Sequence, residues 1–81
     1  MQNIEILFGK AVRWRRTQLG LSQEDFADKA GIHRTYVSSI ELGKVQVSIG
    51  IAQQLASALE MPLSRLWKEV EGKADSSNAR Q

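Results

Sequence analysis

Hydrogen-bonding side chains stand together in the run His33-Arg34-Thr35-Tyr36. The run directly follows Gly31 and Ile32 in the chain, and a glycine can adopt the left-handed conformation that ends one helix and redirects the chain. A helix that lies in the DNA major groove presents base-reading side chains at its N-terminus. These residues therefore predict hydrogen bonds to the edges of DNA bases.

Other chemistries fit the same residues less well. His33 is the only histidine and the chain has no cysteine, so we expect no histidine cluster and no cysteine-based metal site. Ser38 and Ser39 have no base close in the sequence, which argues against a nucleophilic role. The acidic residues between positions 24 and 28 are expected to form a solvated helix face. We therefore expect no enzyme activity, metal, cofactor or small-molecule ligand.

Two short helices flank the glycine at position 31. The first is expected at residues 23–30, and the second begins around His33 or Arg34 and ends before Gly43. Ala27 faces the second helix, where a larger side chain would push the two axes apart. Apolar residues recur near helical spacing on both sides of the turn, namely Phe26, Ala30, Val37 and Ile40.

The remaining pattern is also helical, and no strand pattern is found. Asn3, Ser22 and Ser48 are candidate N-caps. Ile49 is expected on the inward face of the fourth helix, and Pro62 separates that helix from the last one. The expected helices outside the central pair are Ile4–Leu19, a fourth from Ser48 to about Leu59, and a fifth from Leu63 to about Glu71. Residues 1–71 would form one domain, and residues 72–81 a disordered polar tail.

Charge is unevenly distributed along the chain. The net charge is only +2, but residues 1–45 hold seven Lys and Arg against five Asp and Glu, whereas the rest holds four of each. Local placement of basic residues, rather than net charge, sets the attraction to phosphates. No apolar run approaches the roughly 18 residues of a membrane span, and no secretory signal is recognised. We expect a cytoplasmic protein that does not contact membranes.

A family resemblance lies in the spacing of the helix-turn-helix positions. The chain resembles the lambda repressor/Cro family of regulators, also called the XRE family, over about residues 4–71. The run 33–41 is most similar to the small controller proteins of restriction–modification systems. The resemblance implies an all-α fold of five helices, with the helix-turn-helix at the second and third. The matching positions are Gly20-Leu21-Ser22, Gln23, Phe26-Ala27, Ala30-Gly31-Ile32, Val37 and Ile40.

The resemblance also implies roles in DNA binding. Gln23 would bind a phosphate, and Lys44 would touch the DNA backbone. Arg34 and Thr35 would reach base edges, with the Arg34 fork suited to guanine. Tyr36 would contact the sugar-phosphate backbone. The full set of candidate DNA-binding residues is Gln23, His33, Arg34, Thr35, Tyr36, Ser38, Ser39 and Lys44.

Two further features follow from the same resemblance. Arg16 and Glu41 match a family ion pair that ties the first helix to the end of the third. The chain departs from the family at Leu42, where many members carry Arg or Asn, and at Val47, which replaces a frequent proline. One phosphate contact at position 42 would therefore be missing.

The last expected helix carries an apolar stripe at i, i+3, i+4 and i+7. The core of the monomer can bury Leu63 and Leu66, whereas Trp67 and Val70 come late in the chain, where little remains to cover them. An exposed tryptophan beside aliphatic neighbours is a favoured interface anchor, so we expect a homodimer with this helix against its copy. Alternatively, Trp67 folds onto the first helix. The stripe consists of Leu63, Leu66, Trp67 and Val70.

Taken together, the sequence predicts a sequence-specific transcriptional regulator that binds double-stranded DNA as a homodimer on paired half-sites. A restriction–modification controller is one specific form of this hypothesis. The alternative is the antitoxin of a toxin–antitoxin pair, although residues 72–81 have little hydrophobic content with which to wrap a toxin. A protein-interaction module that kept the fold but lost DNA contact would be expected to carry acidic or apolar residues at the groove-facing positions. Those positions hold His, Arg, Thr and Ser instead.

Overall fold

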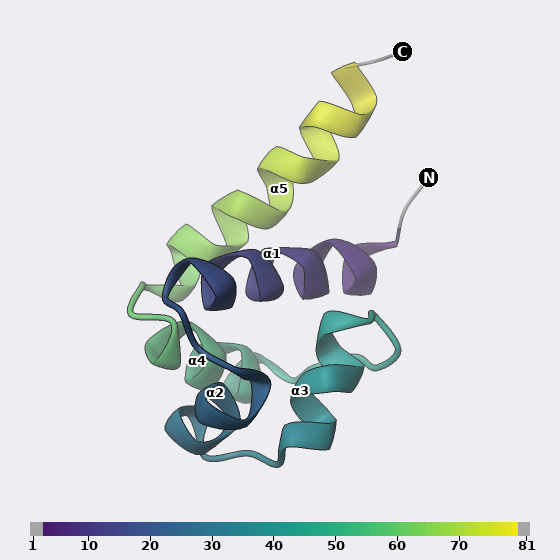
Figure 1. Cartoon of the computed structure of the whole chain (residues 1–81). Helices are drawn as coiled ribbons and strands as arrows, with labels where there is room; N and C mark the ends of the chain where they lie inside the picture. Colours follow the sequence, from purple (N-terminus) through teal and green to yellow (C-terminus); the bar gives the residue numbers. More distant parts are fainter. Residues whose placement is uncertain (1–2, 80–81) are drawn as a thin grey trace.

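The structure, a computed structural model, describes the backbone of residues 3–79 and the side chains of residues 3–72 (Figure 1). This part of the chain consists of helices, turns and loops, without strands. The all-α fold predicted from the sequence is therefore confirmed. The helices in chain order are α1 (Ile4–Gln18), α2 (Gln23–Ala30), α3 (Arg34–Glu41), α4 (Ile49–Ala58) and α5 (Leu63–Ala79).

Side chains fix where three of the helices begin. Asn3, Ser22 and Ser48 each accept a hydrogen bond from the backbone amide three residues further on, at 2.9–3.1 Å. Each bond satisfies an amide that has no partner within its own helix. These residues are the N-caps of α1, α2 and α4, as the sequence predicts.

The turn between α2 and α3 is set by one left-handed residue. Gly31 has φ 76° and ends α2 at Ala30. The amide of Ile32 donates to the carbonyl of Ala27 at 3.0 Å, which satisfies one of the last carbonyls of the helix. The chain turns sharply, and α3 begins at Arg34.

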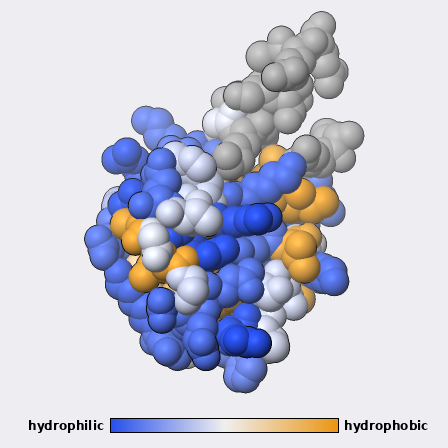
Figure 2. All heavy atoms as spheres, in the orientation of Figure 1, coloured by the Kyte–Doolittle hydropathy of each residue, from blue (hydrophilic) through white to orange (hydrophobic). Residues whose placement is uncertain are grey.

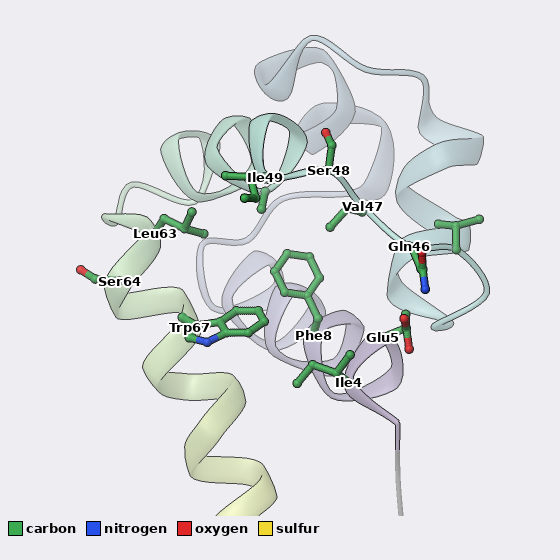
Figure 3. Close-up of a pocket in the computed structure, with 12 residues that line it drawn as sticks. Ile4, Glu5, Phe8, Gln46, Val47, Ser48, Ile49, Leu63, Ser64 and Trp67 are labelled. Carbon is green, nitrogen blue, oxygen red and sulfur yellow. The ribbon is translucent and has the colours of Figure 1, made fainter.

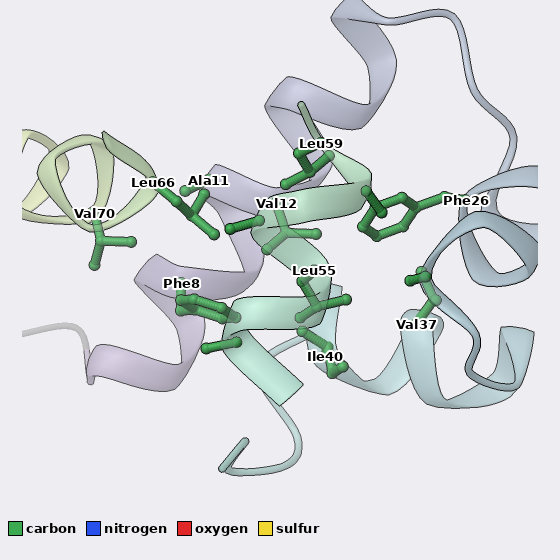
Figure 4. Close-up of a cluster of buried hydrophobic side chains, with 14 of the residues drawn as sticks. Phe8, Ala11, Val12, Phe26, Val37, Ile40, Leu55, Leu59, Leu66 and Val70 are labelled. Carbon is green, nitrogen blue, oxygen red and sulfur yellow. The ribbon is translucent and has the colours of Figure 1, made fainter. Parts of the chain in front are cut away.

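The hydrophobic core lies where the five helices meet (Figure 4). α1 packs against α3 and against α5, whereas α4 packs against α2 and α5 (Figure 1). Leu55 and Leu59 place the inner face of α4 at the centre of this arrangement. Only one face of α3 packs into this core, and the opposite face at its N-terminus is exposed. The largest fully buried side chains are Val12, Phe26, Val37, Ile40, Leu55, Leu59, Leu66 and Val70.

The last helix is longer than the sequence predicts. α5 continues to Ala79, past the expected end near Glu71, so the expected disordered tail is helical in its backbone over residues 72–79. Residues 80 and 81 lie outside the described residues. A glycine inside a helix costs only about 1 kcal/mol relative to alanine, and no proline follows Gly72. Gly72 alone is therefore too weak a stop signal to end the helix.

A close contact between α1 and α3 depends on Gly9. A Cβ atom at this position would lie 2.3 Å from the carbonyl oxygen of Ile40 and 2.7 Å from that of Glu41. Both neighbours are backbone atoms, so a side chain at position 9 cannot be accommodated by a rotamer change. The glycine sets how closely α1 approaches the C-terminal end of α3.

We expect Gly9→Ala to destabilise the fold by about 1–3 kcal/mol or more, because the added methyl group must move one helix away from the other. Thermal or urea unfolding followed by circular dichroism measures the change. Gly72→Ala is the matched control: it adds the same methyl group to a helix with nothing within 4 Å. The control should be neutral or stabilising, and equal losses in both variants would contradict the packing argument.

Candidate nucleic-acid interface

The residues predicted to read bases lie on the exposed start of α3. Arg34 and Thr35 are exposed in the first turn of the helix. Val37 and Ile40 on the opposite face are almost completely buried, which fixes how the helix is rotated about its axis. The N-terminus of α3 can therefore enter a groove of DNA while its inner face stays packed in the core.

His33 is the N-cap of α3. Its Nδ1 atom accepts a hydrogen bond from the backbone amide of Thr35 at 3.2 Å. The same nitrogen lies 2.8 Å from Oγ1 of Thr35. This cap holds the first turn of α3, so His33 has a structural role in the interface whether or not it also contacts DNA.

A hollow of about 450 Å³ lies between the N-terminal ends of α2 and α3. It brings together some of the predicted residues from both helices. The N-terminus of α2 also presents backbone amides there, which favour an anion such as a phosphate. Sequence reasoning missed Ser22 and Glu24 as members of this surface. The lining residues are Ser22, Gln23, Glu24, Arg34, Thr35 and Ser38.

The other predicted residues lie outside this hollow. Tyr36 and Ser39 are half-buried, and Tyr36 packs against the core. Lys44 is exposed just after α3, and its amide donates to the carbonyl of Ser39 at 3.0 Å. This bond closes the left-handed turn at Gly43, where φ is 73°. Lys44 is thereby held at the C-terminal end of α3, away from the residues predicted to read bases.

A buried ion pair connects α1 to α3. Arg16 Nε lies 2.6 Å from Glu41 Oε2, and Arg16 Nη2 donates to Glu41 Oε1 at 3.0 Å. Arg16 Nη1 also donates to the carbonyl of Leu21 at 2.7 Å. The two residues are only 9% and 8% exposed. The two-pronged geometry and the extra carbonyl contact are what a buried pair needs to offset its loss of hydration.

Gln23 belongs to the same hydrogen-bond network. Its Nε2 atom donates to Glu41 Oε1 at 3.1 Å, so its side chain is held from behind by the ion pair. A direct phosphate contact by Gln23 would use the second N–H of its amide or its backbone amide. The family resemblance implies a phosphate contact for Gln23, but no spacing in the sequence predicts this link to Glu41.

An exposed ion pair ties α2 to the turn after α4. Lys29 Nζ lies 2.6 Å from Glu60 Oε2. The hydrogen bond and the positive charge of Lys29 lower the pKa of the Glu60 carboxyl below its ordinary value. Because the pKa is lowered in the folded state, this stabilisation is present at neutral pH and is lost as the pH falls through the folded pKa. Such an exposed pair contributes little to stability.

An apolar groove of about 590 Å³ lies apart from the hollow (Figure 3). Trp67 of α5 packs against Phe8 of α1, with ring centroids 6.2 Å apart. The loop before α4 forms another part of its wall. Exposed apolar side chains stand at the groove: Trp67 is 41% exposed and Ile49 is 82% exposed. On the face shown in Figure 2, hydrophobic residues form only small groups on a mainly hydrophilic surface.

The structure corrects the predicted dimer stripe. Leu66 and Val70 are 0% exposed, because α5 packs across α1 and both side chains belong to the buried cluster (Figure 4). They cannot contact a second copy while the core is intact. Leu63 is half-buried, and only Trp67 is exposed. Ile49, expected to face inward, is the first residue of α4 and lies exposed at the apolar groove instead of in the core.

Within the described residues, no helix is long and apolar enough to cross a membrane. No group of three or more acidic or histidine side chains in that part of the chain is placed to hold a metal ion.

Comparisons with known proteins identify the family to which this chain belongs. The profile of the helix-turn-helix family matches residues 12–66. The chain is 40% identical over 72 residues to control protein C.MunI of a Mycoplasma species, covering 88% of this chain and 97% of that protein. It is 41% identical over 58 residues to control protein C.BamHI of Bacillus amyloliquefaciens, covering 70% of this chain and 72% of that one.

A solved structure shows the same likeness in three dimensions. The restriction-modification controller protein C.AhdI from Aeromonas hydrophila superposes with a TM-score of 0.74 at 39% sequence identity. The match covers 76% of this chain and 94% of that one. It therefore covers nearly the whole of the solved chain.

We expect Arg16→Ala and Glu41→Ala each to cost about 3–5 kcal/mol, because each leaves the other charge buried without its partner. The double variant should lose much less than the sum of the two. Denaturant unfolding of all four proteins gives the coupling energy. Small and additive losses would show that the two side chains act independently in solution.

Proposed function

This chain belongs to the helix-turn-helix family of transcriptional regulators, and from that premise we propose that it binds specific DNA sites as a homodimer and acts as a restriction–modification controller. One observation carries the DNA-reading part: Arg34 and Thr35 are exposed at the N-terminus of a helix whose opposite face is locked in the core. The names of C.MunI, C.BamHI and C.AhdI support the controller assignment. Electrophoretic mobility shifts and selection of bound sites from random DNA test the proposal.

The interface divides into base-reading and phosphate-binding parts. Arg34 offers donors in a planar fork that matches O6 and N7 of guanine. The N-terminus of α2 and the side chain of Lys44 would contact phosphates on either side, which sets the register of α3 on the duplex. Phosphate contacts add affinity without reading sequence, whereas base contacts carry the preference.

The apolar groove is the surface we propose for dimerisation. It shares no lining residue with the hollow between α2 and α3, so a second copy seated there leaves both base-reading ends free. Ile49 and Trp67 supply exposed apolar area beside a concave wall, and a two-fold interface places the same side chains opposite the same groove. Two copies would then occupy half-sites whose centres lie about 10–10.5 bp apart, or a multiple of that spacing.

We expect Arg34→Ala to weaken binding to the selected site by about 1–3 kcal/mol and to relax preference at one position in each half-site. Lys44→Ala should instead weaken binding to all sequences alike and reduce the salt dependence by about one unit per subunit. Fluorescence anisotropy over a salt series, with selected and random duplexes, distinguishes the two effects. If Arg34→Ala keeps the wild-type ratio between selected and random DNA, Arg34 does not read a base.

We expect Ile49→Glu to yield a folded monomer. The side chain is already in solvent, and a negative charge in the first turn of α4 is compatible with the helix dipole, so only self-association should be lost. Trp67→Ala should act in the same direction. Leu42→Glu, which places the same charge on an exposed residue outside the groove, is the control. Sedimentation equilibrium at tens of micromolar gives the mass; a dimeric Ile49→Glu protein would exclude this interface.

A further inference from the structure

The ring of His33 lies beside the hydroxyl group of Thr35 and determines whether that hydroxyl donates or accepts a hydrogen bond. His33 Nδ1 lies 2.8 Å from Thr35 Oγ1 and also accepts the backbone N–H of Thr35 at 3.2 Å. A ring nitrogen that accepts an N–H bond carries no proton of its own. The short contact to Oγ1 must then use the hydroxyl proton, with Thr35 donating to His33. Both contacts are satisfied together only when the ring is neutral and its proton is on Nε2.

This arrangement removes the usual ambiguity of a hydroxyl group. A free threonine hydroxyl can donate or accept, and for that reason it pairs with either kind of base edge. Here the single proton is directed to His33, so the oxygen presents only lone pairs to a ligand. Thr35 is exposed beside Arg34 at the start of α3, where a base edge would approach.

We propose that Thr35 is a specificity-determining residue that accepts a hydrogen bond from the exocyclic amino group of a base in the major groove, and that His33 is the positioning residue that imposes this. In the major groove, amino groups are presented by adenine at N6 and by cytosine at N4. Guanine and thymine offer only acceptors or a methyl group there, so they would face the Thr35 oxygen without a proton to share. The inference rests on the proposed function, since it names the chemistry of one contact in that interface.

Arg34 and Thr35 would then have opposite requirements. The guanidinium of Arg34 donates only, and the Thr35 oxygen accepts only. Adjacent residues at the tip of α3 would select a base edge with acceptors and a base edge with an amino group. Neither residue could take the contact of the other, so the pair would also discriminate against DNA shifted in register.

The experiment begins with sites selected from random DNA by the full-length wild type and by Thr35→Val. Valine has the shape of threonine and leaves the His33 cap to the backbone amide intact. The position whose preference disappears in Thr35→Val is the one that Thr35 reads. At that position, the amino group is removed by substituting purine for adenine or 2-pyrimidinone for cytosine. The base found there distinguishes the two amino-group sources.

The wild type should bind the analogue duplex about 5- to 10-fold more weakly than the natural one, the loss typical of one hydrogen bond. Thr35→Val should bind both duplexes equally. His33→Ala frees the hydroxyl proton, so this variant should also tolerate the reversed base pair, which places the acceptor of guanine or thymine opposite Thr35. His33→Asn, which keeps an accepting oxygen at the N-cap, should restore the preference. A purely structural role of His33 would weaken binding to all sequences alike and leave the preference unchanged.

The proposal is overturned if the wild type binds the natural and analogue duplexes equally. It is also overturned if His33→Ala retains the wild-type preference while folding normally by circular dichroism. The proposed function fails in a different way, because selection would then enrich no site at all with the wild type.

Discussion

The position of α3, the helix proposed to read DNA, depends on the buried contact between Arg16 and Glu41. The pair joins the last turn of α1 to the last residue of α3, and it reaches the turn before α2 through the carbonyl of Leu21. Gln23 extends the network to the first residue of α2. One cluster of charge-assisted bonds therefore holds the N-terminal end of α2 and the C-terminal end of α3. No buried side-chain nitrogen or oxygen among the described residues lacks a hydrogen-bond partner, so the cluster does not carry an unsatisfied charge.

The contact also requires that two backbones come close. Gly9 allows α1 to lie against the carbonyls at the end of α3, and Gly43 lets the chain leave α3 beside Ile6 with its backbone in the left-handed region. With side chains at these two positions, the helices would separate and Arg16 would no longer reach Glu41 in two-pronged geometry. The charged contact thus sets the position of α3, and the small residues make that position attainable.

The fold was readable from the sequence where the signal is local. Ser22 and Ser48 predict helix starts because a serine hydroxyl can cap the first amides of a helix. Gly31 predicts a turn because glycine can adopt the left-handed conformation. The position of Arg34 on the exposed surface followed from the same pattern. What failed was the assignment of exposure in α4 and α5. Periodicity places Val70 on one apolar stripe with Trp67, but it does not show that Val70 is buried while Trp67 is exposed.

The other features that the sequence did not predict are the exposure of one residue and contacts between particular side chains. Ile49 falls at helical spacing with the inward residues Ala52 and Leu55, yet the first residue of a helix can lie beyond the edge of the core. The link from Gln23 to Glu41 spans α2 and α3, and no spacing rule predicts it. The contact between His33 and Thr35 is local, but it depends on ring orientation and on one proton. Residue types alone therefore predict which surface would contact DNA, whereas the donor or acceptor character of a side chain such as Thr35 depends on the geometry of its neighbours.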